Sequence, residues 1–339
     1  MTKQSGARLI ALDWGTSSCR AFLLGNDGIV LSERRGNSGV MDVSTAADLD
    51  GLAYEEAFEE VFEALCGDWL TDLPALPVIA CGMVGSNRGW VQTPYRLLPA
   101  DLTGDGIALT AVPTRRGATV HIISGLMDDS KLPDIIRGEE TQVLGAIVGE
   151  QASGSADLEH ERVVLLPGTH SKWVRIKGST VTSFTTCMTG ELFSLLTTKS
   201  TLAQPSARLE EADWDAFVLG LDVAGAPPGN GGILTTAFSA RTLVMTGRLR
   251  PNQVEDYLSG LLIGSEIADI KASWLADITV QILLCGEPDL NQRYRMALER
   301  FGLSVTHETT TSAVIGMWRT AVSASLLSDA GSPASPTFV

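Results

Sequence analysis

The amino-acid sequence predicts an α/β protein built from two similar domains. Its 339 residues exceed the usual size of one domain, and two domains of ordinary length account for them. Each half opens with the same pattern, in which three short apolar strands are joined by tight turns, and continues into segments with helical spacing. Hydrophobic residues make up 44% of the chain and charged residues 19%, so two buried cores are expected.

The elements of the first half follow from their apolar spacing and from the turn residues between them. Asn26-Asp27-Gly28 is typical of a tight turn between two strands. The acidic segment after residue 53 carries apolar residues at helical spacing, with glutamates on the other side. In chain order we predict strands over Leu9–Leu12, Cys19–Leu24 and Ile29–Arg34, a helix over Tyr54–Leu65, strands over Pro77–Cys81 and Val120–Ser124, and a helix over Glu140–Val148.

A small polar segment, Gly149–Asp157, marks the expected domain boundary, with a first domain over 1–152 and a second over 160–328. The tail over 329–339 is expected to be flexible. In the second half we predict strands over Arg162–Leu166, Lys172–Lys177 and Thr180–Thr185, helices over Glu191–Leu196, Asp213–Leu219, Leu234–Leu243 and Val254–Leu275, a strand over Ile278–Cys285, and helices over Leu290–Phe301 and Thr311–Leu327.

The net charge limits the partners of the chain. The formal net charge is −15, whereas nucleic acid or an acidic membrane would need a basic face. An anionic small ligand stays compatible, because a few cationic side chains, backbone amides and a metal ion reverse the field locally. The apolar runs are shorter than a membrane span, and the N-terminus lacks the apolar core of a signal peptide, so we expect a cytoplasmic protein without a membrane partner.

The cysteines and histidines follow no pattern of metal ligands. His121, His160 and His307 lack metal-ligand spacing, so we assign no protein-bound transition metal. The five cysteines include no CxxC pair and are expected to be reduced, mostly as small core residues: Cys19, Cys66, Cys81, Cys187 and Cys285.

One dipeptide occurs at the same place in both halves. Gly15-Thr16 and Gly168-Thr169 each lie in the turn between the first two strands of a half. A glycine there lets the backbone approach a ligand, and the hydroxyls and amides that follow can face an anion. A single turn of this kind would be explained by hairpin geometry alone. Its repetition favours two phosphate-binding turns, with Asp13 at the end of the first strand suited to a hydrated Mg²⁺.

The chain contains neither of the two standard nucleotide loops, GxxxxGK[ST] and strand–GxGxxG–helix. It does contain "DWGTSSCRAFLL", "GMVGSNRGW", "RGEETQVLGA", "PGTHSKWV" and "CGEPDL", which in this order resemble the 2-dehydro-3-deoxygalactonokinase family of the sugar kinase, Hsp70 and actin superfamily. The resemblance covers nearly the whole chain. It implies two ribonuclease-H-like (actin-like ATPase) domains, with mixed sheets flanked by helices and a ligand cleft for ATP and Mg²⁺ between them.

The same resemblance implies an activity and a set of phosphate-binding residues. The activity is ATP-dependent phosphorylation of 2-dehydro-3-deoxy-D-galactonate at its 6-hydroxyl in galactonate breakdown, giving the 6-phosphate and ADP. Leu166 and Pro167 depart from the superfamily pattern, which often has an acidic or amide residue there, so Asp13 is the main metal anchor, through water. The motifs carry over to Asp13, Gly15, Thr16 and Ser17 (first phosphate motif), Gly168, Thr169, His170 and Lys172 (second), and Cys285, Gly286 and Glu287 (adenosine).

A sugar-acid kinase must also orient the carboxylate of its substrate, which a two-point arginine contact does well. Arg88 lies in a glycine-bounded loop, with Ser86 and Asn87 as neighbouring donors, and we assign these three residues to the substrate. A solvated surface arginine is the alternative. Trp90 either stacks on the substrate or packs in the core.

Two further residues keep two interpretations each. If Asp13 and Arg20 lie on adjacent antiparallel strands, Arg20 pairs with Asp13; otherwise Arg20 reaches a phosphate. His170 touches phosphate, or it is a neutral histidine satisfied by backbone.

Phosphoryl transfer also needs a group that orients the attacking hydroxyl. Glu139 and Glu140 open a helix directly after a glycine, where a carboxylate can project into a cleft and is favoured by the helix dipole. Their simple alternative is the preference of acids for a first helical turn. Of the two we select Glu140 as the base, because it precedes Thr141, as the acid does in related kinases that open the helix with acid-Thr.

The sequence therefore predicts an ATP-dependent 2-keto-3-deoxy sugar-acid kinase, which we expect to be a homodimer. One alternative is a kinase for the gluconate-derived epimer, and another is a phosphohydrolase of the same superfamily, in which Glu139 or Glu140 would activate water. A non-catalytic sugar sensor would carry an added basic helix-turn-helix, whereas this sequence begins at the first strand.

Overall fold

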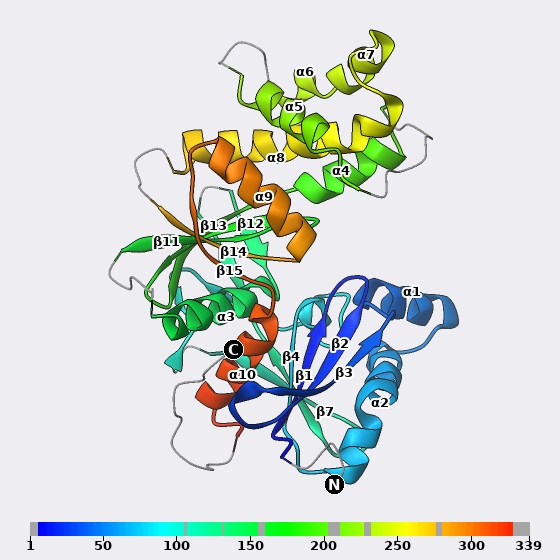
Figure 1. Ribbon diagram of the computed structural model, residues 1–339. Coiled ribbons are helices and arrows are strands. Elements are labelled where there is room, and N and C mark those ends of the chain that lie inside the picture. The colour runs from blue at the N-terminus through cyan, green and yellow to red at the C-terminus, as the bar shows by residue number, and fades with distance from the viewer. Residues whose placement is uncertain are drawn as a thin grey trace. The chain divides into compact units, whose positions relative to one another are not determined.

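A six-stranded mixed sheet with the order β3-β2-β1-β4-β8-β7 forms the first part of the fold (Figure 1). The central strand β1 pairs antiparallel with β2 and parallel with β4, and β4 pairs parallel with β8. The strands span Leu9–Trp14 (β1), Cys19–Leu24 (β2), Val30–Gly36 (β3), Val78–Cys81 (β4), Leu109–Pro113 (β7) and Thr119–Ile123 (β8). A small three-stranded sheet has the order β10-β9-β5, with β5 at Tyr95–Leu97, β9 at Gly125–Asp128 and β10 at Asp134–Ile136.

A second six-stranded sheet has the order β15-β14-β11-β12-β13-β6. Its stretch β13-β12-β11-β14-β15 repeats the order β3-β2-β1-β4-β8 of the first sheet, with a parallel pair at β11–β14 as at β1–β4. This repeat confirms the predicted fold class. The strands are Ala100–Asp101 (β6), Glu161–Leu166 (β11), Ser171–Lys177 (β12), Thr180–Cys187 (β13), Gln281–Cys285 (β14) and Val305–Thr309 (β15).

This computed structural model describes residues 6–104, 107–130, 132–154, 160–202, 211–226, 232–275 and 280–327. Within these ranges no helix is long and apolar enough to cross a membrane. The helices are Val40–Asp50 (α1), Tyr54–Asp72 (α2), Glu139–Ala152 (α3), Thr189–Thr198 (α4), Trp214–Ala224 (α5), Ile233–Thr236 (α6), Ser239–Met245 (α7), Val254–Ser273 (α8), Pro288–Arg300 (α9) and Ser312–Ser323 (α10). Short 3-10 helices lie at Asn26–Gly28, Met83–Gly85 and Pro251–Gln253.

Contacts divide the chain into two compact units, each with its own core. Unit 1 comprises Met1–Glu161, Val174–Phe184 and Thr311–Val339, and unit 2 comprises Arg162–Trp173 and Thr185–Thr310. The domain boundary predicted at Gly149–Asp157 stays a prediction. Residues 155–157 of that segment and the tail 329–339 lie outside the described residues.

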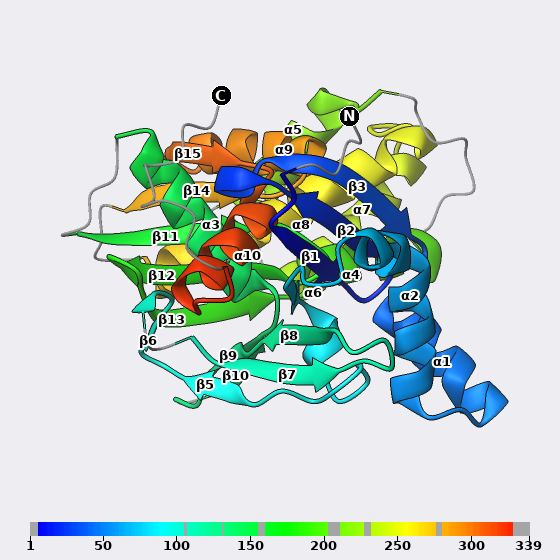
Figure 2. The ribbon, with the colours of Figure 1, turned by 90° about the horizontal axis from the view of Figure 1, so that it is seen from below.

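The core of unit 1 follows from the alternation of side chains along β1. Ile10 and Leu12 pack with Phe58 and Phe62 of α2 on one face of the sheet. The intervening residues of β1 pack with α10 on the opposite face, and Figures 1 and 2 show α2 and α10 on opposite sides of the sheet. In unit 2, residues of β11 and β14 pack in one hydrophobic cluster with residues of α8 and α9.

The thiols lie mostly inside these cores. Cys19, Cys66, Cys81 and Cys285 are buried and Cys187 is half-buried, and these five cysteines form no disulfide. Burial raises the pKa of Cys66 to about 12 and also raises the pKa values of Cys19 and Cys81 above their ordinary range. These are inert core thiols.

The predicted elements match the structure where apolar spacing is strong. The strand Cys19–Leu24 is confirmed to the residue, and the helix predicted from Tyr54 runs one turn and more beyond Leu65. The single helix predicted over Leu234–Leu243 is wrong, because the structure has two short helices there, α6 and α7. Helix α1 and the strands β5, β6, β7, β9, β10 and β15 were not predicted, and residues 278–279 of the strand predicted to end at Cys285 lie outside the described ranges.

Helices α3 and α10 touch backbone to backbone through two glycines. A Cβ atom added to Gly145 would overlap the carbonyl oxygen of Ser312, and one added to Gly316 would overlap that of Thr141. The two helices lie side by side in Figures 1 and 2. The glycines therefore set the distance between them.

Gly145→Ala and Gly316→Ala should each lower the free energy of unfolding by about 1–3 kcal/mol, the usual cost of overpacking. Denaturant unfolding followed by circular dichroism measures this. Gly232→Ala is the control, because an added Cβ meets nothing within 4 Å there, and it should change stability far less. Equal effects at all three positions would contradict the close helix contact.

Candidate functional site

The first Gly-Thr turn is held open to solvent by helix α1. The amide of Gly15 donates to the carbonyl of Ser18 at 2.9 Å, and the amide of Val40 donates to the carbonyl of Gly15 at 3.0 Å. Gly39 lies so close that an added Cβ would overlap the backbone of Ser17. Thr16 and Ser17 are exposed, so their amides and hydroxyls lie at the surface of unit 1.

Asp13 lies beside this turn and forms an ion pair. Its Oδ2 accepts from Nη2 of Arg20 at 2.6 Å, and the two residues are direct partners across β1 and β2. The pairing interpretation of Arg20 is therefore the one found. The Asp13 side chain keeps 19% of its surface exposed, so part of the carboxylate still faces solvent.

Two glycines bring the start of α3 to the end of β1. Gly82, which follows β4, has φ 94°, and an added Cβ would lie 2.7 Å from the carbonyl oxygen of Trp14. Gly138, which precedes α3, has φ 105°, and its added Cβ would lie 2.9 Å from the Cα of Gly82. Only glycine adopts such backbone conformations at low cost. The carboxylates of Asp13, Glu139 and Glu140 therefore belong to one part of unit 1.

The acid pair at the start of α3 is folded back onto its own loop. Oε2 of Glu139 accepts from the amide of Arg137 at 2.9 Å, and Oε2 of Glu140 accepts from the amide of Gly138 at 2.7 Å. Oε1 of Glu140 also accepts from the hydroxyl of Thr141 at 3.0 Å. Glu140 thus accepts from the amide of the N-cap residue Gly138, and Glu139 accepts from the amide of the residue before it.

The two acids differ in exposure. Glu140 is 3% exposed, and burial, helped by the charge of Glu139, raises its pKa from 4.5 to about 7. Glu139 is only half-buried. The sequence argument selected Glu140 as the base, whereas accessibility favours Glu139 for contact with a substrate hydroxyl.

The loop assigned to the substrate carries a half-exposed arginine. Nη2 of Arg88 lies 3.0 Å from Oδ2 of Asp48, and the guanidinium lies 5.9 Å from the ring centroid of Tyr54. Ser86 is buried and accepts from the amide of Arg88 at 3.3 Å, while Asn87 is exposed. These contacts hold the loop in place beside α1 and α2.

Trp90 is a packing residue rather than a stacking platform. It is 3% exposed and packs among Trp14, Phe58 and Phe62. The packing interpretation of Trp90 is therefore the one found.

Arg137 is a site-forming residue that the sequence analysis missed. Its buried guanidinium donates to the hydroxyl and the carbonyl of Thr93, the latter at 2.9 Å, and stacks 4.2 Å from the ring centroid of Tyr95. An added Cβ on Gly85 would lie 2.9 Å from Nη1 of Arg137. Arg137 thus connects the loop that was assigned to the substrate with the loop that precedes α3. The sequence signal that could have found it is its position directly before Gly138-Glu139.

The second Gly-Thr turn, in unit 2, is held by the start of α4. An added Cβ on Gly190 would overlap the carbonyl oxygen of Gly168, and the amide of Glu191 donates to the carbonyl of Thr169 at 2.8 Å. His170 is exposed and pairs with the carboxylate of Glu191, so neither interpretation made from sequence describes its observed contact.

Lys172 lies inside the fold. It is 5% exposed and donates from Nζ to the carbonyl of His170 at 2.7 Å, so this buried side chain stabilises the backbone that follows Gly168-Thr169.

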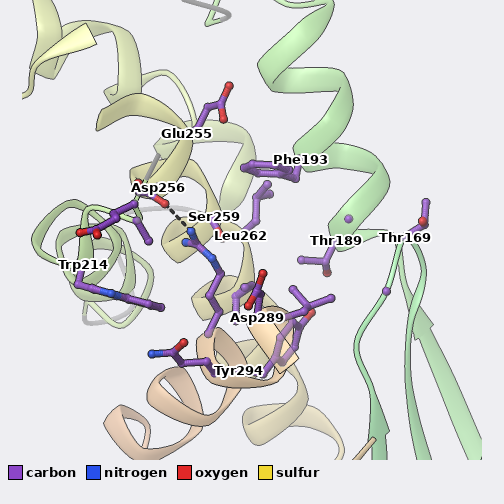
Figure 3. Close-up of a pocket in the computed structure, with 18 of the residues that line it drawn as sticks. Thr169, Thr189, Phe193, Trp214, Glu255, Asp256, Ser259, Leu262, Asp289 and Tyr294 are labelled. Atoms are coloured by element: carbon purple, nitrogen blue, oxygen red, sulfur yellow. Dashed lines mark hydrogen bonds and ion pairs between the residues drawn. The ribbon is translucent and has the colours of Figure 1, made fainter. Parts of the chain in front are cut away.

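A cavity of about 850 Å³ opens beside this second turn (Figure 3). Gly168 and Thr169 line one part of it, together with the start of α4, and the remaining walls come from α5, α8 and α9. Polar lining residues include Thr189, Glu211, Asn252, Glu255, Asp256, Ser259, Asp289, Gln292 and Arg293, and the apolar ones include Phe193, Trp214, Leu262, Ile263 and Leu290.

A buried carboxylate holds two of the lining residues of this cavity. Glu266 of α8 is 6% exposed and accepts from Nε1 of Trp173 at 2.7 Å, from the hydroxyl of Tyr294 at 2.7 Å and from the hydroxyl of Thr189. Burial raises its pKa, and these donors oppose the rise. Through Thr189 and Tyr294 the carboxylate joins the start of α4 to α9.

The predicted adenosine motif forms the turn between β14 and α9. An added Cβ on Gly286 would lie 2.7 Å from Oδ1 of Asn291 and 3.3 Å from Pro167, so the turn packs tightly against the strand end before Gly168. Glu287 immediately precedes α9, whose next residues include Asp289 and Leu290 of the cavity wall. Among the residues that the structure describes, no group of three or more His, Cys, Asp or Glu side chains could hold a metal ion.

The raised pKa of Glu140 predicts a pH-dependent stability. The folded protein holds this proton more tightly than the unfolded chain, so the free energy of unfolding falls as pH rises from about 4.5 to about 7. The contribution amounts to about 3 kcal/mol. Glu140→Gln should remove it, as measured by denaturant unfolding of both proteins at several pH values. If stability depends on pH in the same way in the wild-type protein and in Glu140→Gln, the assignment of Glu140 as a buried acid is contradicted.

Glu139→Gln should shift the pH range over which stability falls to lower pH, because it removes the negative charge next to Glu140.

Comparisons with known proteins identify relatives of this chain. The profile of a family described as 2-keto-3-deoxy-galactonokinase matches residues 13–320. The 2-dehydro-3-deoxygalactonokinase of Escherichia coli (strain K12) is 35% identical over 303 residues, which cover 88% of this chain and 92% of that protein. A crystal structure of a protein from Sinorhizobium meliloti, described as a 2-dehydro-3-deoxygalactonokinase, is 33% identical with a TM-score of 0.74, and the match covers 92% of this chain and 98% of that one. The chain therefore belongs to the 2-keto-3-deoxy-galactonokinase family.

Proposed function

We propose that the protein transfers the γ-phosphoryl group of ATP to the 6-hydroxyl of 2-dehydro-3-deoxy-D-galactonate, in the cytoplasm and within galactonate breakdown. Family membership over residues 13–320 supports the reaction class. The observation that carries the assignment to a site is the contact of Gly82 with both Trp14 and Gly138, which joins the Asp13 turn to the acid pair of α3. Phosphoryl transfer uses groups that neutralise charge at the phosphates and a carboxylate that orients the attacking hydroxyl.

The nucleotide would bind in the cavity of unit 2. The backbone of Gly168-Thr169 and the first turn of α4 offer amide donors for phosphate oxygens. Gly286 and Glu287 position the start of α9, whose residues line the same cavity. The cavity volume of about 850 Å³ is in the range of small-molecule sites.

Asp13 fits the magnesium ion that such a kinase uses. Its carboxylate is partly exposed beside an exposed turn of backbone amides and hydroxyls, and Mg²⁺ prefers carboxylate oxygen while keeping most of its waters. When bound, the ion would neutralise charge on the transferred phosphate. The ion pair with Arg20 would orient the carboxylate of Asp13.

Glu139 would be the general base and Glu140 a positioning acid. The half-buried Glu139 has the access that a proton acceptor needs, whereas Glu140 is almost fully enclosed. Glu140 instead holds the amide of Gly138 and the hydroxyl of Thr141, which fixes the loop that presents Glu139.

The sugar-acid carboxylate would bind at the substrate loop, through Arg88 with Ser86 and Asn87. The side chain of Arg88 is 40% exposed, and in the described part of the chain its buried Nε has no hydrogen-bond partner. A planar guanidinium can give a carboxylate two parallel hydrogen bonds.

A coupled assay of ADP release tests the function. With 2-dehydro-3-deoxy-D-galactonate, ADP release should depend on the sugar acid, and kcat/KM should exceed that for the gluconate-derived epimer by at least about 10-fold, because a misplaced hydroxyl leaves polar groups of the site unpaired. Release of phosphate from ATP at the same rate without any sugar acid would instead identify a phosphohydrolase.

The assignment of the base is tested by two matched amide variants. Glu139→Gln should lower kcat by roughly 10²–10⁴-fold, the usual contribution of general base catalysis, with sugar-acid binding retained. Glu140→Gln should lower kcat much less. Steady-state kinetics and calorimetric binding on both variants measure this, and a larger loss in Glu140→Gln would exchange the two roles.

A further inference from the structure

The nucleotide cavity has two chemically different ends. At one end lie the backbone amides of Gly168-Thr169 and the start of α4. Toward the walls from α5 and α8 lie the carboxylates of Glu255 and Asp256 (Figure 3). Arg293 is the one cation among the residues described as lining the cavity. Because these carboxylates repel phosphate, the phosphates belong at the Gly168-Thr169 end and the base of the nucleotide at the other.

The base end is walled by an aromatic residue, Trp214, the first residue of α5. Trp214 is half-buried and lines the cavity, and Figure 3 shows its indole extending from α5 toward the enclosed space. Its ring meets that of Phe217 nearly perpendicularly, with centroids 5.7 Å apart. Phe217 is fully buried, so it supports the indole from the core.

Arg293 and Asp256 hold this wall in place from α9 and α8. The guanidinium of Arg293 lies 5.3 Å from the ring centroid of Trp214, and its Nη2 donates to Oδ1 of Asp256 at 2.5 Å. Oδ2 of Asp256 accepts from the amide of Asp213, which caps α5, at 2.8 Å. Asp256 therefore neutralises this cation, and the ion pair links the indole to the residue that caps α5.

We propose that Trp214 is the stacking platform for the nucleobase, and that it makes the protein prefer purine over pyrimidine nucleotides. Arg293 and Asp256 are its positioning residues. The inference rests on the proposed function only in placing a nucleotide in this cavity. A purine covers more of an indole face than a pyrimidine does, and base–aromatic stacking depends on that overlap.

The test is calorimetric binding of ADP, CDP and pyrophosphate to the full chain, without sugar acid. The wild-type protein should bind ADP at least about 5-fold more tightly than CDP. Trp214→Ala should weaken ADP binding roughly 5- to 150-fold, the range found for removing one base–aromatic stack, and should reduce the preference over CDP. Pyrophosphate binding should stay unchanged, because its contacts lie at the other end of the cavity.

Trp214→Phe is the conservative variant, and it should restore most of the affinity and of the preference for ADP. It also keeps the test decisive if Trp214→Ala fails to fold. Equal wild-type affinities for ADP and CDP would overturn the inference, as would an equal loss of ADP and pyrophosphate binding in Trp214→Ala. If Trp214 controls the ADP preference but no sugar acid is phosphorylated, the inference stands and the proposed function fails.

Discussion

The candidate site of unit 1 depends on one steric constraint, the absence of side chains at Gly82 and Gly138. Both residues have positive φ, and each lies too close to its neighbour for a Cβ atom. This contact places the end of β1 against the start of α3, so a carboxylate from a strand and two from a helix share one region. The ion pair of Asp13 with Arg20 and the caps made by Glu139 and Glu140 all build on that approach.

Much of the fold could be predicted from sequence because the strands and turns are locally encoded. The repeated Gly-Thr turn between apolar strands indicated the duplicated strand order, and the turn at Asn26-Asp27-Gly28 forms as a tight connection in which Asp27 has φ 57°. Helix α1 was missed because its sequence lacks a clear apolar stripe. It is defined instead by a tertiary contact, the fit of Gly39 against Ser17.

The site was less predictable, because burial decides the role of a side chain and a local motif does not reveal burial. Trp90 and Arg88 lie two residues apart in one loop, yet the first is enclosed among aromatic rings and the second is partly open to solvent. The same holds for the acid pair of α3, where adjacent residues differ in exposure. Glu266 and Arg137 carry no motif, and their importance comes from the elements that they connect.

The burial of the thiols has a practical consequence for chemical labelling. Thiolate is the species that reacts with maleimides and disulfides, and a raised pKa together with enclosure in the core suppresses it. Cys19, Cys66 and Cys81 combine both properties. A single cysteine introduced on an exposed helix would therefore react far ahead of these three thiols, so these three need not be replaced before a fluorophore is attached.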